Sequence, residues 1–305
     1  MNIKNPLDIK DIGDPYVLNV KGTYYLYATS NFNGFYCWKS DNLSDWSEPH
    51  ICYEATDKSF GNSCFWAPEV YEFNGKYYMY YTAQWKIHQE EALRIGVAVA
   101  NRPEGPFVDV LEGTPMFDFG YGALDAHILK DGVHNYMYYS RAGADHYVNG
   151  AKESDVYVVE LGNDLISVKG QGVLILSPEQ EWERAKEPEN QYWNEGPFVL
   201  KYQGKYHMMY SANFYASKYY SIGGAVAESP MGPFIKYENN PILVTNHAIS
   251  GPGHNSVVMT ATGDYYCVYH AHTDYDRPSG DRQVYITPLD FVDGKICLKH
   301  PEISK

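Results

Sequence analysis

Residues 67–82 read Ala-Pro-Glu-Val-Tyr-Glu-Phe-Asn-Gly-Lys-Tyr-Tyr-Met-Tyr-Tyr-Thr, a short run, a turn with glycine, and an aromatic strand that ends on a hydroxyl residue. Related phrases occur four more times along the chain, and they begin at Asp14, Asp125, Glu195 and His254. We refer to the first residue of each copy, Ala67 included, as its anchor. Repeats at this spacing are typical of propellers and solenoids.

The repeat predicts an all-β fold, a five-bladed β-propeller with four antiparallel strands in each blade around a central channel. The anchors lie somewhat further apart than the about 40 to 50 residues of a typical blade, so each unit carries loop insertions. The longest insertion, residues 177–194, is highly charged and predicts a surface loop, with a helical turn as an option, over the mouth of the channel. Since no Pro-, Gly- or Ser-rich linker divides the chain, we expect residues 1–305 to form a single domain.

The composition limits the classes of partner. With 305 residues and 44% hydrophobic content, the chain can bury a large core. Its 30 tyrosines suit half-buried strands, and their hydroxyls could face a sugar. A net charge of -14 opposes nucleic acid and anionic membrane surfaces, which leaves a neutral small molecule as the easier partner. No segment is long and apolar enough to cross a bilayer.

The cysteines and the N-terminus bear on location. The five cysteines show no metal-binding spacing, and their odd number predicts reduced thiols. Residues 1–6 lack the apolar run and cleavage site of a signal peptide. We therefore expect a cytoplasmic protein. The sequence does not indicate an oligomeric state.

Three of the five anchors are carboxylates, namely Asp14, Asp125 and Glu195. Taken singly, Asp14 could be a turn-forming Asp-Pro and Glu195 a solvated loop residue. Equivalent positions on the inner strands of a propeller meet around the channel, however, so all three are expected to converge. Converging carboxylates raise the proton affinity of at least one member. Glycoside hydrolysis needs this arrangement, because one carboxylic acid protonates the leaving oxygen while a second carboxylate activates water.

Motifs along the whole chain resemble those of glycoside hydrolase family 43. In order they are Asp14-Pro-Tyr, Trp66-Ala-Pro-Glu69, Leu124-Asp125-Ala, Glu195-Gly-Pro, Gly253-His254 and Arg282-Gln-Val-Tyr-Ile-Thr-Pro-Leu. The resemblance implies a five-bladed propeller that hydrolyses pentosides with inversion. It also implies roles that spacing alone cannot rank, with Asp14 as general base, Glu195 as general acid, and Asp125 as the carboxylate that orients the acid and tunes its pKa.

Several further residues are candidates for substrate binding. Arg282 is the stronger candidate, because its guanidinium can hold a carboxylate and sugar hydroxyls in one fixed fork; the competing interpretation is an ordinary surface ion pair. Trp66 and Trp193 flank anchors and could stack on a sugar ring, with Phe32 and Tyr192 as weaker candidates. For each of these aromatic residues, core or loop packing is the competing interpretation.

Two patterns raise the question of a metal. His254 is the fifth anchor, and it is either a contact for substrate or an ion in the channel or a hydrogen-bonded core histidine. His270, His272 and Asp274 could share one strand face as ligands, but the segment also reads as a strand leading into an active-site loop. We expect that catalysis requires no cofactor, and we keep a structural calcium ion in the central channel as an option.

The leading hypothesis is a β-xylosidase or α-L-arabinofuranosidase that removes terminal xylose or arabinofuranose from short oligosaccharides. One alternative is a propeller phosphorylase acting on mannosides, which would need a cluster of basic residues for phosphate. Another is a non-catalytic carbohydrate-binding propeller, which would need aromatic platforms but not three converging carboxylates.

Overall fold

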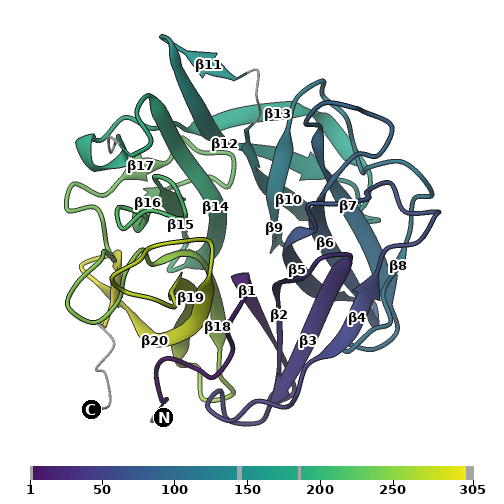
Figure 1. Ribbon diagram of the computed structural model, residues 1–305, viewed down its shortest axis with the longest axis horizontal. Helices are drawn as coiled ribbons and strands as arrows, with labels where there is room; N and C mark the ends of the chain where they lie inside the picture. Colours follow the sequence, from purple (N-terminus) through teal and green to yellow (C-terminus); the bar gives the residue numbers. More distant parts are fainter. Residues whose placement is uncertain (1–2, 143–145, 185–186, 300–305) are drawn as a thin grey trace.

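The computed structural model describes residues 3–142, 146–184 and 187–299, and its strands form five antiparallel units around a central axis (Figure 1). The five-bladed β-propeller predicted from the repeat is confirmed. Among the described residues, no helix has the length and apolar character needed to span a membrane.

Each blade begins with the strand nearest the channel and proceeds outward. The first blade comprises β1 (Gly13–Val20), β2 (Thr23–Asn31), β3 (Gly34–Ser40) and β4 (His50–Glu54). The second comprises β5 (Trp66–Phe73), β6 (Lys76–Gln84), β7 (Leu93–Ala100) and β8 (Val108–Asp109). The third comprises β9 (Ala123–Asp131), β10 (His134–Arg141), β12 (Ala151–Leu161) and β13 (Val168–Leu176), with the short β11 (Tyr147–Val148) paired to β12.

The fourth blade comprises β14 (Gln191–Tyr202), β15 (Lys205–Ala212), β16 (Ser221–Ala227) and β17 (Ile235–Lys236). The fifth comprises β18 (Gly253–Met259), β19 (Tyr265–His272), β20 (Arg282–Val292) and β21 (Lys295–Leu298). The third and fourth blades are joined into one sheet, because residues 152–154 of β12 pair in parallel with residues 191–193 of β14.

The tyrosines of the repeat mostly fill the core between blades rather than facing a sugar. Tyr27 and Tyr81 of the repeated phrase, together with Tyr53 of β4, are nearly inaccessible to solvent and pack in one cluster between the first two blades. Their hydroxyls are satisfied inside the protein: Tyr81 lies 2.9 Å from the Tyr53 hydroxyl and donates to Asp109 at 2.5 Å. A tyrosine can therefore fill the wide space between blades and still satisfy its polar end.

A bulge lies near the start of every inner strand, where the pairing with the second strand shifts register. The residue at the bulge has a positive φ in all five blades, and these residues are Asp14 (55°), Ala67 (47°), Asp125 (58°), Gly196 (57°) and His254 (42°). The expected common register of the anchors is thus wrong for the fourth blade. Glu195 precedes the bulge residue and is equivalent to Gly13 and Leu124.

Each bulge is hydrogen-bonded to a neighbouring blade through the last residue of the repeated phrase. The backbone N–H groups of Ala67, Asp125, Gly196 and His254 donate to the hydroxyls of Thr29, Thr82, Ser140 and Ser211, in that order. In the fifth position the hydroxyl is replaced by His270, whose Nδ1 accepts from the N–H of Asp14 at 3.0 Å. The hydroxyl at the end of the aromatic strand therefore fixes the anchor of the next blade.

The N-terminal segment closes the ring by pairing with the last blade. Leu7 donates its N–H to the carbonyl of Val284, and the side chain of Asn5 bonds both the N–H and the carbonyl of Ile286. In Figure 1 this purple segment lies beside the yellow strand β20. The first and last parts of the chain are thereby held together without a covalent link.

The insertion before the fourth blade has the helical turn that the sequence left as an option, but it is not wholly the predicted surface loop. It contains a 3₁₀ turn, η1 (Glu181–Glu183), and Glu183 has no exposed surface. A charged residue in a long insertion is here part of the interior, because it finds a buried partner in β17.

Candidate active site

A cavity of about 310 Å³ opens at the end of the channel where the inner strands begin. The structure brings the three anchor carboxylates to its wall: Asp14 from β1, Asp125 from β9 and Glu195 from β14. The bulges make this convergence compatible with the register difference, because two successive residues at a bulge can both face the cavity. Leu124 and Asp125, for example, both line it.

Asp14 is surrounded by groups that stabilise its charged form. Thr29 donates to Oδ2 at 2.5 Å, while Arg282 and His254 each place a nitrogen 3.2 Å from Oδ1. Burial alone would raise the pKa of Asp14, but the charges of His254 and Arg282 and the bond from Thr29 outweigh it and hold the pKa well below its usual range. Asp14 is therefore a carboxylate near neutral pH.

His270 lies behind Asp14 as a neutral ring. Its burial and the nearby Arg282 charge hold the pKa of His270 well below the usual value. The geometry agrees, because Nδ1 accepts the N–H of Asp14 and must lack a proton to do so. The 3.6 Å approach of this ring to the Asp14 carboxylate is therefore no ion pair near neutral pH, and Arg282 supplies the permanent charge.

Asp125 is the most deeply placed of the three carboxylates. Its Oδ2 accepts from the hydroxyl of Ser140 at 2.9 Å and from the N–H of Gly196 at 3.1 Å. Burial raises the pKa of Asp125, and the charge of Asp14 adds to this effect. Through Gly196, Asp125 holds the backbone immediately after Glu195.

Glu195 has the opposite environment to Asp14. Burial, followed by the negative charge of Asp125, raises its pKa to about 8, so the carboxyl group is protonated near neutral pH. The hydroxyl of Tyr220 lies 2.8 Å from Oε1 and fixes the orientation of the group. The ring of Tyr220 stacks on His270 at a centroid distance of 5.7 Å, which links the acid side of the cavity to the base side.

Glycines make room for these contacts. A Cβ atom at Gly13 would overlap the guanidinium of Arg282, and one at Gly253 would overlap the ring of Tyr220. Gly196 combines a positive φ with a Cβ position 3.1 Å from the His254 ring, so any larger residue would be strained there.

The predicted substrate-binding residues divide into two groups. Arg282, His254, Trp66 and Trp193 line the cavity, and the guanidinium of Arg282 also lies over the ring of Tyr215. Phe32 is not among the lining residues; it is 90% exposed at the β2–β3 turn. Tyr192 also lies outside the lining, with its ring beneath Arg184.

Sequence reasoning missed Tyr220 and Thr29, which contact the candidate acid and base directly. The sequence pattern could have pointed to Thr29, since it ends the repeated phrase at a position that is a hydroxyl residue in four of the five copies. No such pattern pointed to Tyr220, because it lies in a connection between strands and meets Glu195 only through tertiary packing.

The candidate metal ligands do not form a set. Within residues 3–142, 146–184 and 187–299, no three His, Cys, Asp or Glu side chains are arranged to hold a metal ion. His272 bonds the Ser250 hydroxyl and the carbonyl of Tyr215, and Asp274 pairs with Arg277. The Nδ1 of His254 faces Asp14. These side chains alone do not make a calcium site, so a channel ion near His254 stays a prediction.

Comparison with known proteins decides the family. The sequence model of glycosyl hydrolases family 43 matches residues 3–296. The chain belongs to family 43. Within family 43, a β-D-galactofuranosidase of Aspergillus niger is 31% identical over 94% of this chain and 82% of its own length. A xylosidase/arabinosidase of Humicola insolens is 26% identical over 90% of this chain and 87% of its own.

Solved structures agree with this assignment. A thermostable family 43 glycoside hydrolase superimposes with a TM-score of 0.93 at 46% identity, covering 100% of this chain and 98% of its own. An endo-1,4-beta-xylanase of Bacteroides thetaiotaomicron gives a TM-score of 0.83 at 30% identity, with 97% of both chains covered. The protein is therefore a family 43 glycoside hydrolase, and the names of its relatives span several furanoside and xyloside substrates.

Proposed function

We propose that the protein is an inverting hydrolase that removes terminal xylose or arabinofuranose from short oligosaccharides. The observation that carries the proposal is the contrast within one cavity: the pKa of Asp14 lies below its usual range and that of Glu195 is raised to about 8. Two carboxyl groups whose environments separate their pKa values are suited to be base and acid at the same pH.

In the proposed mechanism, Asp14 accepts a proton from water while the water oxygen attacks the anomeric carbon. The bond from that carbon to the glycosidic oxygen breaks, and the departing oxygen takes the proton of Glu195. Asp125 keeps Glu195 protonated by its charge and oriented through Gly196. Arg282 holds Asp14 in its charged form. After product release, Asp14 gives its proton to solvent and Glu195 takes up a proton from solvent.

The size and lining of the cavity support action at a chain end. Its volume is at the lower end of the range for ligand sites, about 300 to 1,000 Å³, which suits one sugar ring better than several. Trp66 and Trp193 offer apolar faces beside the carboxylates.

The substrate is tested with 4-nitrophenyl β-D-xyloside, α-L-arabinofuranoside, β-D-galactofuranoside and β-D-mannoside, each with and without inorganic phosphate. We expect turnover of a pentoside without phosphate. Fastest turnover of the galactofuranoside would reassign the sugar, turnover only with phosphate would favour a phosphorylase, and none with any of them would contradict the proposal.

The stereochemistry is tested by proton NMR of the first-formed sugar. Direct attack by water inverts the anomeric centre, so the product should be the opposite anomer to the substrate before mutarotation. A retained anomer would mean that a carboxylate acts as nucleophile, and the assignment of Asp14 as base would be wrong.

A further inference from the structure

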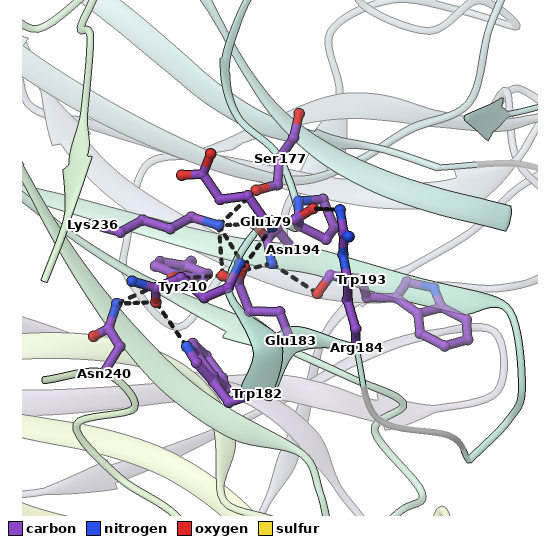
Figure 2. A network of polar contacts seen from close by, with 12 residues as sticks. Ser177, Glu179, Trp182, Glu183, Arg184, Trp193, Asn194, Tyr210, Lys236 and Asn240 are labelled. Atoms are coloured by element: carbon purple, nitrogen blue, oxygen red, sulfur yellow. Dashed lines mark hydrogen bonds and ion pairs between the residues drawn. The ribbon is translucent and has the colours of Figure 1, made fainter. Parts of the chain in front are cut away.

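A buried ion pair between Glu183 and Lys236 contacts Asn194, the residue before Glu195 (Figure 2). The Lys236 ammonium is 2.6 and 2.7 Å from the two carboxylate oxygens of Glu183, and both side chains are almost completely buried. The same ammonium donates to the amide oxygen of Asn194 at 2.9 Å and to the carbonyl of Ser177 at 2.6 Å. Figure 2 shows these groups converging on the Lys236 nitrogen.

The remaining hydrogen-bonding capacity of Glu183 is also used. Its carboxylate accepts from the N–H groups of Glu179 and Gln180, each at 2.7 Å, and from the hydroxyl of Tyr210 at 2.7 Å. Asn194 donates to it at 3.3 Å. A buried pair with this many partners compensates its desolvation far better than an isolated one.

The network crosses the blade from its outer edge to the channel. Lys236 belongs to the outermost strand β17, Glu183 to the turn η1 of the insertion, and Asn194 to the inner strand β14. The Lys236 ammonium lies 5.1 Å from the centre of the Tyr210 ring on β15. The insertion is thus attached to the blade through the residue that precedes Glu195.

Asn194 connects the ion pair to the cavity. It has no exposed surface, and its amide donates both to Glu183 and to the carbonyl of Trp193. Trp193 lines the cavity, and Glu195 is the candidate acid. Since the N–H of Gly196 is held by Asp125 and Ser140, the backbone of Glu195 is held on both sides.

We propose that Glu183, Lys236 and Asn194 form a positioning network that holds Glu195 at the distance and angle needed to protonate the leaving oxygen. The inference rests on the proposed function, since it presupposes an acid at Glu195. The competing explanation is that the ion pair only fastens the insertion to the blade, in which case its loss would weaken the fold without selecting among substrates.

The two explanations predict a different dependence of the variants' activity loss on the leaving group. A misplaced acid slows glycosides with a poor leaving group, whereas a 2,4-dinitrophenyl glycoside needs little protonation and should react nearly as before. We use the methyl and 2,4-dinitrophenyl glycosides of whichever sugar the wild-type protein hydrolyses best. The reference variant is Glu195→Gln, which should show the full leaving-group effect.

The principal variant is Asn194→Ala, which leaves the Glu183 and Lys236 charges paired. We expect kcat on the methyl glycoside to fall by about 10- to 100-fold, as for an active-site displacement of up to about 1 Å. On the dinitrophenyl glycoside we expect less than about a threefold change, because that leaving group needs little help from the acid. The double variant Glu183→Gln/Lys236→Met removes both charges together and should show the same pattern, and it remains informative if Asn194→Ala does not fold.

The matched control is Met208→Ala, which opens a cavity in the same blade at a fully buried residue outside the network. It should lower thermal stability, and any change in kcat should be the same for the methyl and the dinitrophenyl glycoside. The positioning role would be overturned if Asn194→Ala and the double variant lost kcat equally on both glycosides, as the control does. It would also be overturned if neither variant lost kcat. A Glu195→Gln variant without leaving-group dependence would instead contradict the proposed function itself.

Discussion

At the scale of single residues, the candidate active site is defined by what surrounds each carboxyl group. Asp14 and Glu195 line the same cavity, yet Arg282 lies 3.2 Å from the first, whereas the second has a tyrosine hydroxyl and, further off, another carboxylate. Neighbouring charge therefore separates two groups that burial alone would shift in the same direction.

Replacing Asp14 with Asn removes the proposed base while keeping the size of the side chain. We expect kcat/KM to fall by about 10²- to 10⁴-fold on every substrate, since loss of general base catalysis does not depend on the leaving group. Calorimetric titration with the released sugar should show that binding persists. More than a few per cent of residual activity would contradict the assignment.

The pH profile tests the coupling between Asp125 and Glu195. Glu195 must be protonated to act as an acid, so kcat/KM should be lost as pH rises through about 8. The charge of Asp125 raises the pKa of Glu195, and Asp125→Asn should therefore move this alkaline limb to lower pH. If the limb stayed in place while the maximum fell, Asp125 would act only by positioning Gly196.

At the scale of elements, the bulge at the start of each inner strand decides where the carboxylates point. Its positive φ values are held by hydrogen bonds from the bulge N–H groups to neighbouring strands, four of them to Thr or Ser hydroxyls. This explains why an aromatic strand in this repeat ends on a hydroxyl residue.

Thr82→Val tests one of these bonds with a side chain of nearly the same shape. It removes the acceptor for the buried N–H of Asp125, which should lower the free energy of unfolding by about 1 to 3 kcal/mol. Denaturant unfolding measures the change, and Thr114→Val at an exposed position serves as control. Equal stability of the two variants would show that the bond does not hold the bulge.

At the scale of the whole molecule, closure of the ring depends on segments at opposite ends of the chain. Asn5 and Ile286 are joined by two hydrogen bonds, and Leu7 adds a third to Val284. The core between the first and fifth blades depends on this closure, because a propeller that opens exposes the facing surfaces of these two blades.

Asn5→Ala should loosen the closure. Both backbone groups of Ile286 would lose their partner, with an expected loss of about 1 to 3 kcal/mol in the free energy of unfolding. Hydrogen exchange should rise at Ile286 in particular, whereas Asn239→Ala at an exposed site should change neither quantity. Unchanged exchange at Ile286 in the Asn5 variant would contradict a role in closure.

The amino-acid sequence by itself predicted the five-bladed architecture and the convergence of Asp14, Asp125 and Glu195, although the common register assumed for these residues fails at Glu195. Both follow from local pattern, because strand alternation, turn glycines and the repeated phrase act within a few residues. The family motifs indicated which carboxylate would be the base, which the acid and which the orienting residue, and the spacing alone could not supply this.

Only the tertiary structure decided the rest. It placed Glu195 one position before its bulge, brought Tyr220 to the acid, left Phe32 outside the cavity and buried Glu183 against Lys236. The Glu183 and Lys236 side chains lie 53 residues apart in the chain and meet across a blade face. Such contacts arise from packing between distant strands, and a charged insertion shows no local sign of the buried partner that makes it part of the core.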